Sequence, residues 1–142
     1  MIKKTLLLFT CFTALLSCNQ HSESHNFEVD GIYYKIVDED SRLAMVTYKG
    51  KDWEDYDNEY RDTILIPNTV TYRNKVYRIT EIGDYAFRGC SEMTSISLPS
   101  SLKQIHNYAF CGCDNLKEIY CKALTPPSIN CYYNNFHDDV VI

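Results

Sequence analysis

The sequence predicts a single domain that is a repeat solenoid, mainly β, with an N-terminal β-hairpin cap. The segment 79–99 recurs as residues 102–121 at an offset of 23 residues, a spacing typical of repeat solenoids. The segments before it alternate between apolar and polar side chains around turn signals, which indicates β-strands. A hydrophobic share of 45% over 142 residues is that of one globular domain, so disorder of the whole chain is excluded.

The repeat keeps its apolar positions and varies the polar positions between them. Such a pattern predicts stacked coils with an apolar interior and a solvated exterior. Gly89 and Gly112 are expected where the backbone turns tightly with a positive φ. The positions that are identical in both copies are Ile82/Ile105, Tyr85/Tyr108, Ala86/Ala109, Phe87/Phe110, Gly89/Gly112, Cys90/Cys113 and Ile96/Ile119.

The shared pattern Ile-Gly-x-Tyr-Ala-Phe-x-Gly-Cys-x-x-Met/Leu-x-x-Ile-x-Leu-Pro closely resembles the BspA-like leucine-rich repeats of surface lipoproteins in Bacteroides-type bacteria. The resemblance covers roughly residues 27–131. It implies short right-handed leucine-rich-repeat coils with short helical turns. It also implies a protein that presents a surface to a ligand.

Shorter elements flank the two full repeats. Residues 64–67 align with 96–99 and predict an earlier strand, and residues 71–78 predict a hairpin that turns near Asn74 and Lys75. Residues 27–37 alternate around Asp30 and Gly31, and residues 44–48 supply a following strand, so this segment is expected to cap the first coil. Residues 140–142 are expected to add a closing strand.

The N-terminus has the features of an export signal. Lys3 and Lys4 precede an apolar run that is too short for a membrane-spanning helix, which needs about 20 residues. The run ends at Ser17 and Cys18, which resemble the lipobox of bacterial lipoproteins. We therefore expect residues 1–17 to be a signal peptide and Cys18 to be lipidated, with residues 18–26 as a flexible tether. The alternative is a plain secretory signal.

The remaining chain divides into a cap with an acidic-aromatic loop (27–62) and a leucine-rich-repeat domain with a C-terminal cap (63–142). Removing residues 1–17 takes two of the 14 basic side chains and none of the 19 acidic ones, so the net charge falls from −5 to −7. A chain with this negative net charge is unsuited to binding nucleic acid or anionic lipid. The expected location is the outer membrane, at the cell surface or on the periplasmic face, with the membrane contacted through the lipid anchor.

Five cysteines remain after the signal peptide and Cys18, and an odd number argues against a complete disulfide framework. Cys90, Cys113 and Cys121 fall at interior positions and are expected to be small buried apolar groups. A Cys90–Cys113 disulfide is the alternative. Cys111 is expected to be exposed and is the best candidate for a reactive thiol. A zinc site is a weaker alternative, because its members lack paired Cys-x-x-Cys spacing: Cys111, Cys113, Cys131 and His137.

Two groups of exposed side chains are candidates for ligand binding. The loop 51–62 holds Trp53, Tyr56 and Tyr60 among acids, and it is either a solvated connection with Trp53 tucked over the edge of the cap or a binding loop. The second group lies on the sheet expected from residues 94–99 and 117–122, where Lys117 and Tyr120 are ligand-binding candidates. The side chains expected to be exposed on that sheet are Thr94, Ser95, Ser97, Lys117, Glu118 and Tyr120.

The sequence favours a binding or adhesion module for a host or bacterial surface protein or a glycan. A structural or accessory envelope protein without a ligand is the alternative, and a thiol- or metal-dependent enzyme is the third class. No nucleophile elbow, phosphate loop or zincin helix is present, so we predict no catalytic residue, cofactor or metal. His106 stands where the earlier repeat has Gly83, with no acid fixed beside it by the sequence.

Overall fold

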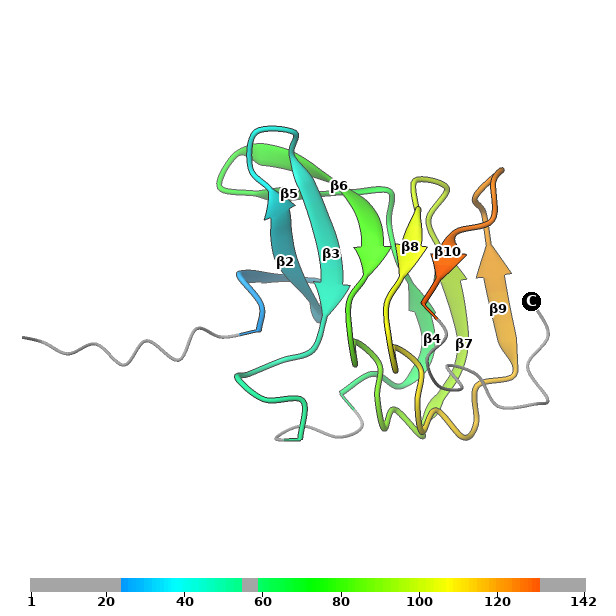
Figure 1. The fold of residues 1–142 in the computed structure, drawn as a ribbon. Coiled ribbons are helices and arrows are strands. Elements are labelled where there is room, and N and C mark those ends of the chain that lie inside the picture. The colour runs from blue at the N-terminus through cyan, green and yellow to red at the C-terminus, as the bar shows by residue number, and fades with distance from the viewer. Residues whose placement is uncertain (1–23, 55–58, 131–142) are drawn as a thin grey trace, which may run out of the picture.

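The computed structural model describes residues 24–54 and 59–130, which form a solenoid of two facing β-sheets (Figure 1). The signal peptide, Cys18, Tyr56 and the closing strand at 140–142 lie outside the described residues. None of the described residues forms a helix that is long and apolar enough to span a membrane.

The first sheet runs in the order β1-β2-β3-β6-β8-β10, with β5 paired to β6, and the second runs in the order β4-β7-β9. The pairs β3–β6, β6–β8, β8–β10, β4–β7 and β7–β9 are parallel, as expected when successive coils stack. The strands are β1 (Phe27–Val29), β2 (Ile32–Asp38), β3 (Leu43–Thr47), β4 (Asp62–Leu65), β5 (Thr69–Tyr72), β6 (Lys75–Ile82), β7 (Met93–Leu98), β8 (Gln104–Ile105), β9 (Glu118–Cys121) and β10 (Ser128–Ile129).

Both predicted hairpins are present. β1 and β2 turn at Asp30 and Gly31, whose φ values of 52° and 76° are those of a type I′ turn. β5 and β6 turn at Arg73 and Asn74, with φ values of 48° and 60°, one residue before the predicted position. The primed turn matches the right-handed twist of the strands, and Asn74 tolerates the positive φ that it requires.

The turns between the two sheets contain no helix in the described part of the chain, although short helical turns were expected. The N–H groups of Tyr85, Phe87 and Gly89 donate instead to carbonyls of the next coil, at 3.1, 2.8 and 2.8 Å. The residues between them close i→i+3 turns within their own coil. Because alternate N–H groups are taken by the neighbouring coil, a continuous helical ladder cannot form. Gly89 and Gly112 have the expected positive φ, 72° and 76°.

Stacked aromatic rings fill the interior behind these turns. Phe87 lies 5.2 Å from Phe110 in nearly parallel planes, and Tyr60 continues the row at 4.8 Å from Phe87. A second row at the turn surface runs from Trp53 through Tyr85 to Tyr108, with ring spacings of 4.8 and 5.1 Å. The loop before β4 therefore supplies the same aromatic positions as the repeat turns, and acts as the turn of an additional coil.

The cap and the repeats share one sheet and one core. β3 of the cap pairs in parallel with β6, and Ala44 and Val46 are buried beside Ile79 and Ile82. Gly83 follows β6 where this contact is closest, and a Cβ built there would lie 3.0 Å from the carbonyl oxygen of Val46. The cap and the repeats thus form one packed unit, and the boundary predicted between residues 62 and 63 falls inside β4.

Candidate functional site

The outer face of the β4-β7-β9 sheet carries two rows of side chains across three coils. Ile64, Ile96 and Ile119 pair across the strands and point into the core, so their sequence neighbours point outward. One outward row joins Thr63, Ser95 and Glu118, and the other joins Leu65, Ser97 and Tyr120. We define the second row as the Leu65–Tyr120 row.

The Leu65–Tyr120 row places large apolar groups on both sides of a small polar one. Leu65 is 66% exposed and Tyr120 is 55% exposed, whereas Ser97 between them is only 6% exposed. Among the residues that the structure describes, the Ser97 Oγ has no hydrogen-bond partner. A buried hydroxyl without a partner costs about 1–3 kcal/mol, and a ligand group that bonded to it would remove that cost. The side chains that must move to admit such a group are Leu65 and Tyr120, both on flanking strands.

Polar groups beside this row are already organised. The Thr63 Oγ1 and Ser95 Oγ are 2.8 Å apart, and the Tyr120 hydroxyl donates to the Glu118 Oε2 at 2.7 Å. That hydrogen bond, together with the carboxylate charge, raises the pKa of Tyr120. Lys117 is exposed directly before β9, where its N–H donates to the carbonyl of Thr94. The side chains of Tyr120 and Lys117 are thus exposed, as the sequence predicted.

The prediction that Ser95 and Ser97 are exposed is wrong, because larger neighbours on the flanking strands cover them. Their exposed fractions are 9% and 6%. Thr94 and Glu118, by contrast, are exposed as expected.

Tyr60 and Trp53 do not form an exposed recognition loop. Tyr60 is 2% exposed, and its hydroxyl donates to the carbonyl of Thr47 at 3.0 Å and accepts from the N–H of Tyr33 at 3.1 Å. Burial raises its pKa well above the usual value for tyrosine. Trp53 is half-buried, stacked on Tyr85, with the Arg88 guanidinium carbon 4.0 Å from its ring centre. Their side chains therefore serve the packing of the coils, and Trp53 covers the repeat turn rather than the edge of the cap.

The four described cysteines are free thiols, so the alternative of a Cys90–Cys113 disulfide is not realised. Cys113 is buried and donates to the carbonyl of Phe87 at 2.9 Å, and burial strongly raises its pKa. Cys111 is only half-buried rather than exposed. Cys121 pairs with Leu98 as predicted but is also half-buried, because it lines an apolar hollow of about 310 Å³ at the last described coil.

The sequence did not indicate a contact between His106 and Glu81. Their Nε2 and Oε2 atoms are 2.7 Å apart across neighbouring coils, and both side chains are about four-fifths buried. Glu81 pairs with Gln104 of the next coil, and His106 lies two residues further along on the same side, so this contact depends on the register of the stacked coils. Within residues 24–54 and 59–130, no three His, Cys, Asp or Glu side chains are grouped as for a metal. The zinc hypothesis also needs Cys131 and His137, which lie outside the described residues.

Comparison with known proteins identifies the repeat. The family model described as "BspA type Leucine rich repeat region (6 copies)" matches residues 62–138. No curated protein matches the chain.

Solved structures with the same fold include three leucine-rich repeat proteins. One from Bacteroides ovatus is 24% identical, with a TM-score of 0.51, over 67% of this chain and 29% of its own. One from Bacteroides capillosus is 24% identical, with a TM-score of 0.53, over 67% of this chain and 64% of its own. A leucine rich cell surface protein from Faecalibacterium prausnitzii is 23% identical, with a TM-score of 0.54, over 72% of this chain and 25% of its own. The chain thus spans less than two-thirds of each of these proteins.

Proposed function

The chain belongs to the BspA-type leucine-rich-repeat family, and we propose that it is an exported, lipid-anchored envelope protein that binds a surface protein or glycan. The binding surface in this proposal is the outer face of the β4-β7-β9 sheet. Solenoids use extended faces of this kind for recognition, because stacked coils repeat a side-chain row at regular spacing. The leucine rich cell surface protein from Faecalibacterium prausnitzii, a structural relative, supports a role at the cell surface.

The Leu65–Tyr120 row is the observation that carries the binding proposal. Tyrosine is enriched in the hot spots of interfaces, which lie in well-packed, desolvated surroundings, so Tyr120 is the main anchor of this row. Here a ligand would cover Leu65 and Tyr120 and supply a partner for the Ser97 hydroxyl. Polar groups at the margin, from Lys117 and Glu118, would fix its orientation.

The binding proposal is tested by screening the purified chain on arrays of extracellular matrix proteins and bacterial and host polysaccharides. Leu65→Ser and Tyr120→Ser should each weaken a detected interaction by about 2 kcal/mol, or roughly 30-fold, as for a hot-spot side chain. Val76→Ser is the matched control, since Val76 is 56% exposed on the β5–β6 hairpin and should leave binding unchanged.

An array that gives no interaction, or one that all three variants weaken equally, would contradict this proposal. An envelope defect on gene deletion that Leu65→Ser and Tyr120→Ser both rescue would favour the alternative, a structural or accessory protein.

The anchor proposal depends on the N-terminal sequence. Lys3, Lys4, the apolar run and Cys18 support export with lipidation, and several acyl chains on one residue hold a protein firmly to a membrane. Mass spectrometry of the mature N-terminus should find an acylated Cys18, and Cys18→Ser should release the protein from the membrane fraction. An unmodified N-terminus in the soluble fraction of wild-type cells would leave only a plain secretory signal.

A further inference from the structure

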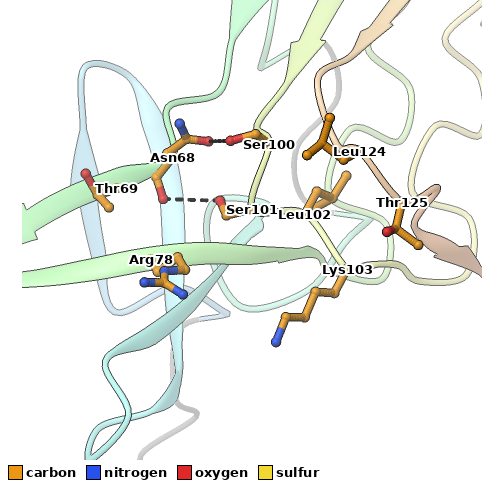
Figure 2. A pocket seen from close by; sticks show the side chains of 9 residues that line it. All are labelled: Asn68, Thr69, Arg78, Ser100, Ser101, Leu102, Lys103, Leu124 and Thr125. Atoms are coloured by element: carbon orange, nitrogen blue, oxygen red, sulfur yellow. Dashed lines mark hydrogen bonds between the residues drawn. The ribbon is translucent and has the colours of Figure 1, made fainter.

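A second recess lies where the coils pass from one sheet to the other, and we call it the corner pocket. Three successive coils line it, through residues 68–69, 100–103 and 124–125, together with Arg78 from β6 (Figure 2). Its volume is about 680 Å³, within the range of small-molecule sites. It shares no residue with the Leu65–Tyr120 row.

The charge of the corner pocket is opposite to that of the chain. Arg78 and Lys103 line it, and no acid does, although the chain has 19 acidic and 14 basic side chains. Neither cation forms an ion pair with any residue in the described part of the chain. Arg61 and Lys75, by contrast, are each paired with a glutamate. Two uncompensated cations beside one hollow create a local positive potential that attracts an anionic group.

Polar side chains of two coils line the corner pocket together with these cations. The Ser100 Oγ donates to the Asn68 Oδ1 at 2.9 Å, and the Ser101 Oγ donates to the carbonyl of Ile79 at 2.6 Å, which ties the corner segments to β6. Figure 2 shows these hydroxyls above the strand that carries Arg78, with the cationic ends of Arg78 and Lys103 below it. Leu124 on the rim is fully exposed and adds an apolar surface.

We propose that the corner pocket binds a small acidic saccharide through its carboxylate or sulfate group. The planar guanidinium of Arg78 suits two-point binding of an oxyanion, and Lys103 supplies a second charge. The hydroxyl and amide groups of Ser100 and Asn68 match the hydroxyls of a sugar ring, and Leu124 suits its C–H face. A site with only two cations on an acidic chain is suited to one anionic group and unsuited to a nucleic acid, whose affinity requires many phosphate contacts.

The test is calorimetric titration of the full chain with saccharides of two or three rings. Trigalacturonic acid presents carboxylates, a 6-sulfated N-acetyllactosamine presents a sulfate, and galactotriose is neutral. We expect one or both acidic saccharides to bind, with an affinity that falls as salt rises, and galactotriose not to bind. Arg78→Gln and Lys103→Gln should each weaken binding by about tenfold or more, because each removes a charge that contacts the anionic group.

Two matched variants control for the change in net charge. Arg61→Gln and Lys35→Gln remove exposed cations that do not line the pocket, and both should bind as the wild type does. Arg78→Lys keeps the charge and loses the planar guanidinium, so its affinity should lie between those of the wild type and Arg78→Gln. Binding of neither acidic saccharide, equal binding of galactotriose, or equal loss in the control variants would overturn the proposal. A hexaglutamate peptide that binds where the saccharides fail would overturn it as well.

The inference is independent of the proposed function. Leu65→Ser and Tyr120→Ser should leave acidic-saccharide binding intact, because neither residue lines the corner pocket. Failure at one site therefore leaves the other proposal standing.

Discussion

Substituting Tyr60 by Phe tests whether the acidic-aromatic loop is a structural part of the solenoid. Its hydroxyl lies at the end of the β2–β3 ladder, where Tyr33 pairs with Thr47. It accepts from the N–H of Tyr33 and donates to the carbonyl of Thr47, so it bridges backbone groups of two paired strands. Tyr60→Phe removes this bridge and keeps the ring that stacks 4.8 Å from Phe87.

The expected loss of stability follows from these two bonds. Leaving a buried backbone group without a partner costs about 1–3 kcal/mol, and part of this cost is recovered if the strands close slightly. We therefore expect the free energy of unfolding to fall by about 2 kcal/mol. For a domain of this size, this corresponds to a decrease in Tm of roughly 4–10 °C.

The assay is urea denaturation followed by circular dichroism, with Tyr72→Phe as the control. Tyr72 is half-buried and stacks on Phe27, but its hydroxyl forms no hydrogen bond with the described residues, so its loss should cost less than about 0.5 kcal/mol. A Tyr60→Phe variant as stable as Tyr72→Phe would refute the structural role. Loss of ligand binding at unchanged stability would restore the binding-loop hypothesis.

Three further changes have defined outcomes. Gly83→Ala should lower the free energy of unfolding by about 1–3 kcal/mol in urea melts, because its Cβ would lie 3.0 Å from the backbone oxygen of Val46, which cannot rotate away. The hydrogen bond from Lys75 holds the pKa of Glu39 below its usual 4.5. The ionised Glu39 side chain therefore stabilises the fold above pH 4.5, and this stabilisation is lost as the pH falls through the lowered pKa. Glu39→Gln should therefore lower Tm at pH 7 and reduce the fall in Tm between pH 5 and pH 3, and an unchanged acid profile would contradict this. Cys113 should resist iodoacetamide at pH 8 in the folded protein and react on unfolding, as measured by peptide mass spectrometry. Rapid labelling of the native state would contradict the burial of this thiol.

The repeat and the hairpins could be predicted because local residues determine them. Phe87 and Phe110 recur at the repeat offset, and they stack at 5.2 Å as a shared interior position requires. Asp30 and Gly31 specify a primed turn whatever surrounds them. The β5–β6 turn was predicted near Asn74 and Lys75 and lies one residue earlier, because Arg73 and Asn74 are the two residues that take a positive φ.

The role of the acidic-aromatic loop could not be predicted, because its aromatic residues do not keep the repeat spacing. Tyr60 precedes Phe87 by 27 residues and Trp53 precedes Tyr85 by 32, whereas the repeat offset is 23. The acids around them predicted exposure to solvent, and only the stacking of the coils shows that Tyr60 enters the core and that Trp53 packs on Tyr85.

The candidate face was predicted only in part, for a related reason. Tyr120 was correctly placed outside, since strand alternation determines its side. The burial of Ser97 depends on the size of Leu65 and Tyr120 in adjacent coils, which a single strand does not reveal. The corner pocket likewise joins Arg78 and Lys103, which occupy different positions in the repeat.

Hydroxyl-radical footprinting shows whether the outer face of the β4-β7-β9 sheet contacts the ligand. The purified chain would be oxidised with and without the partner found on the array, and modification would be quantified at each side chain. We predict that Leu65 and Tyr120, exposed by 66% and 55% in the free chain, become protected while Val76 does not. Protection confined to other surfaces, with Leu65 and Tyr120 oxidised as in the free chain, would contradict it.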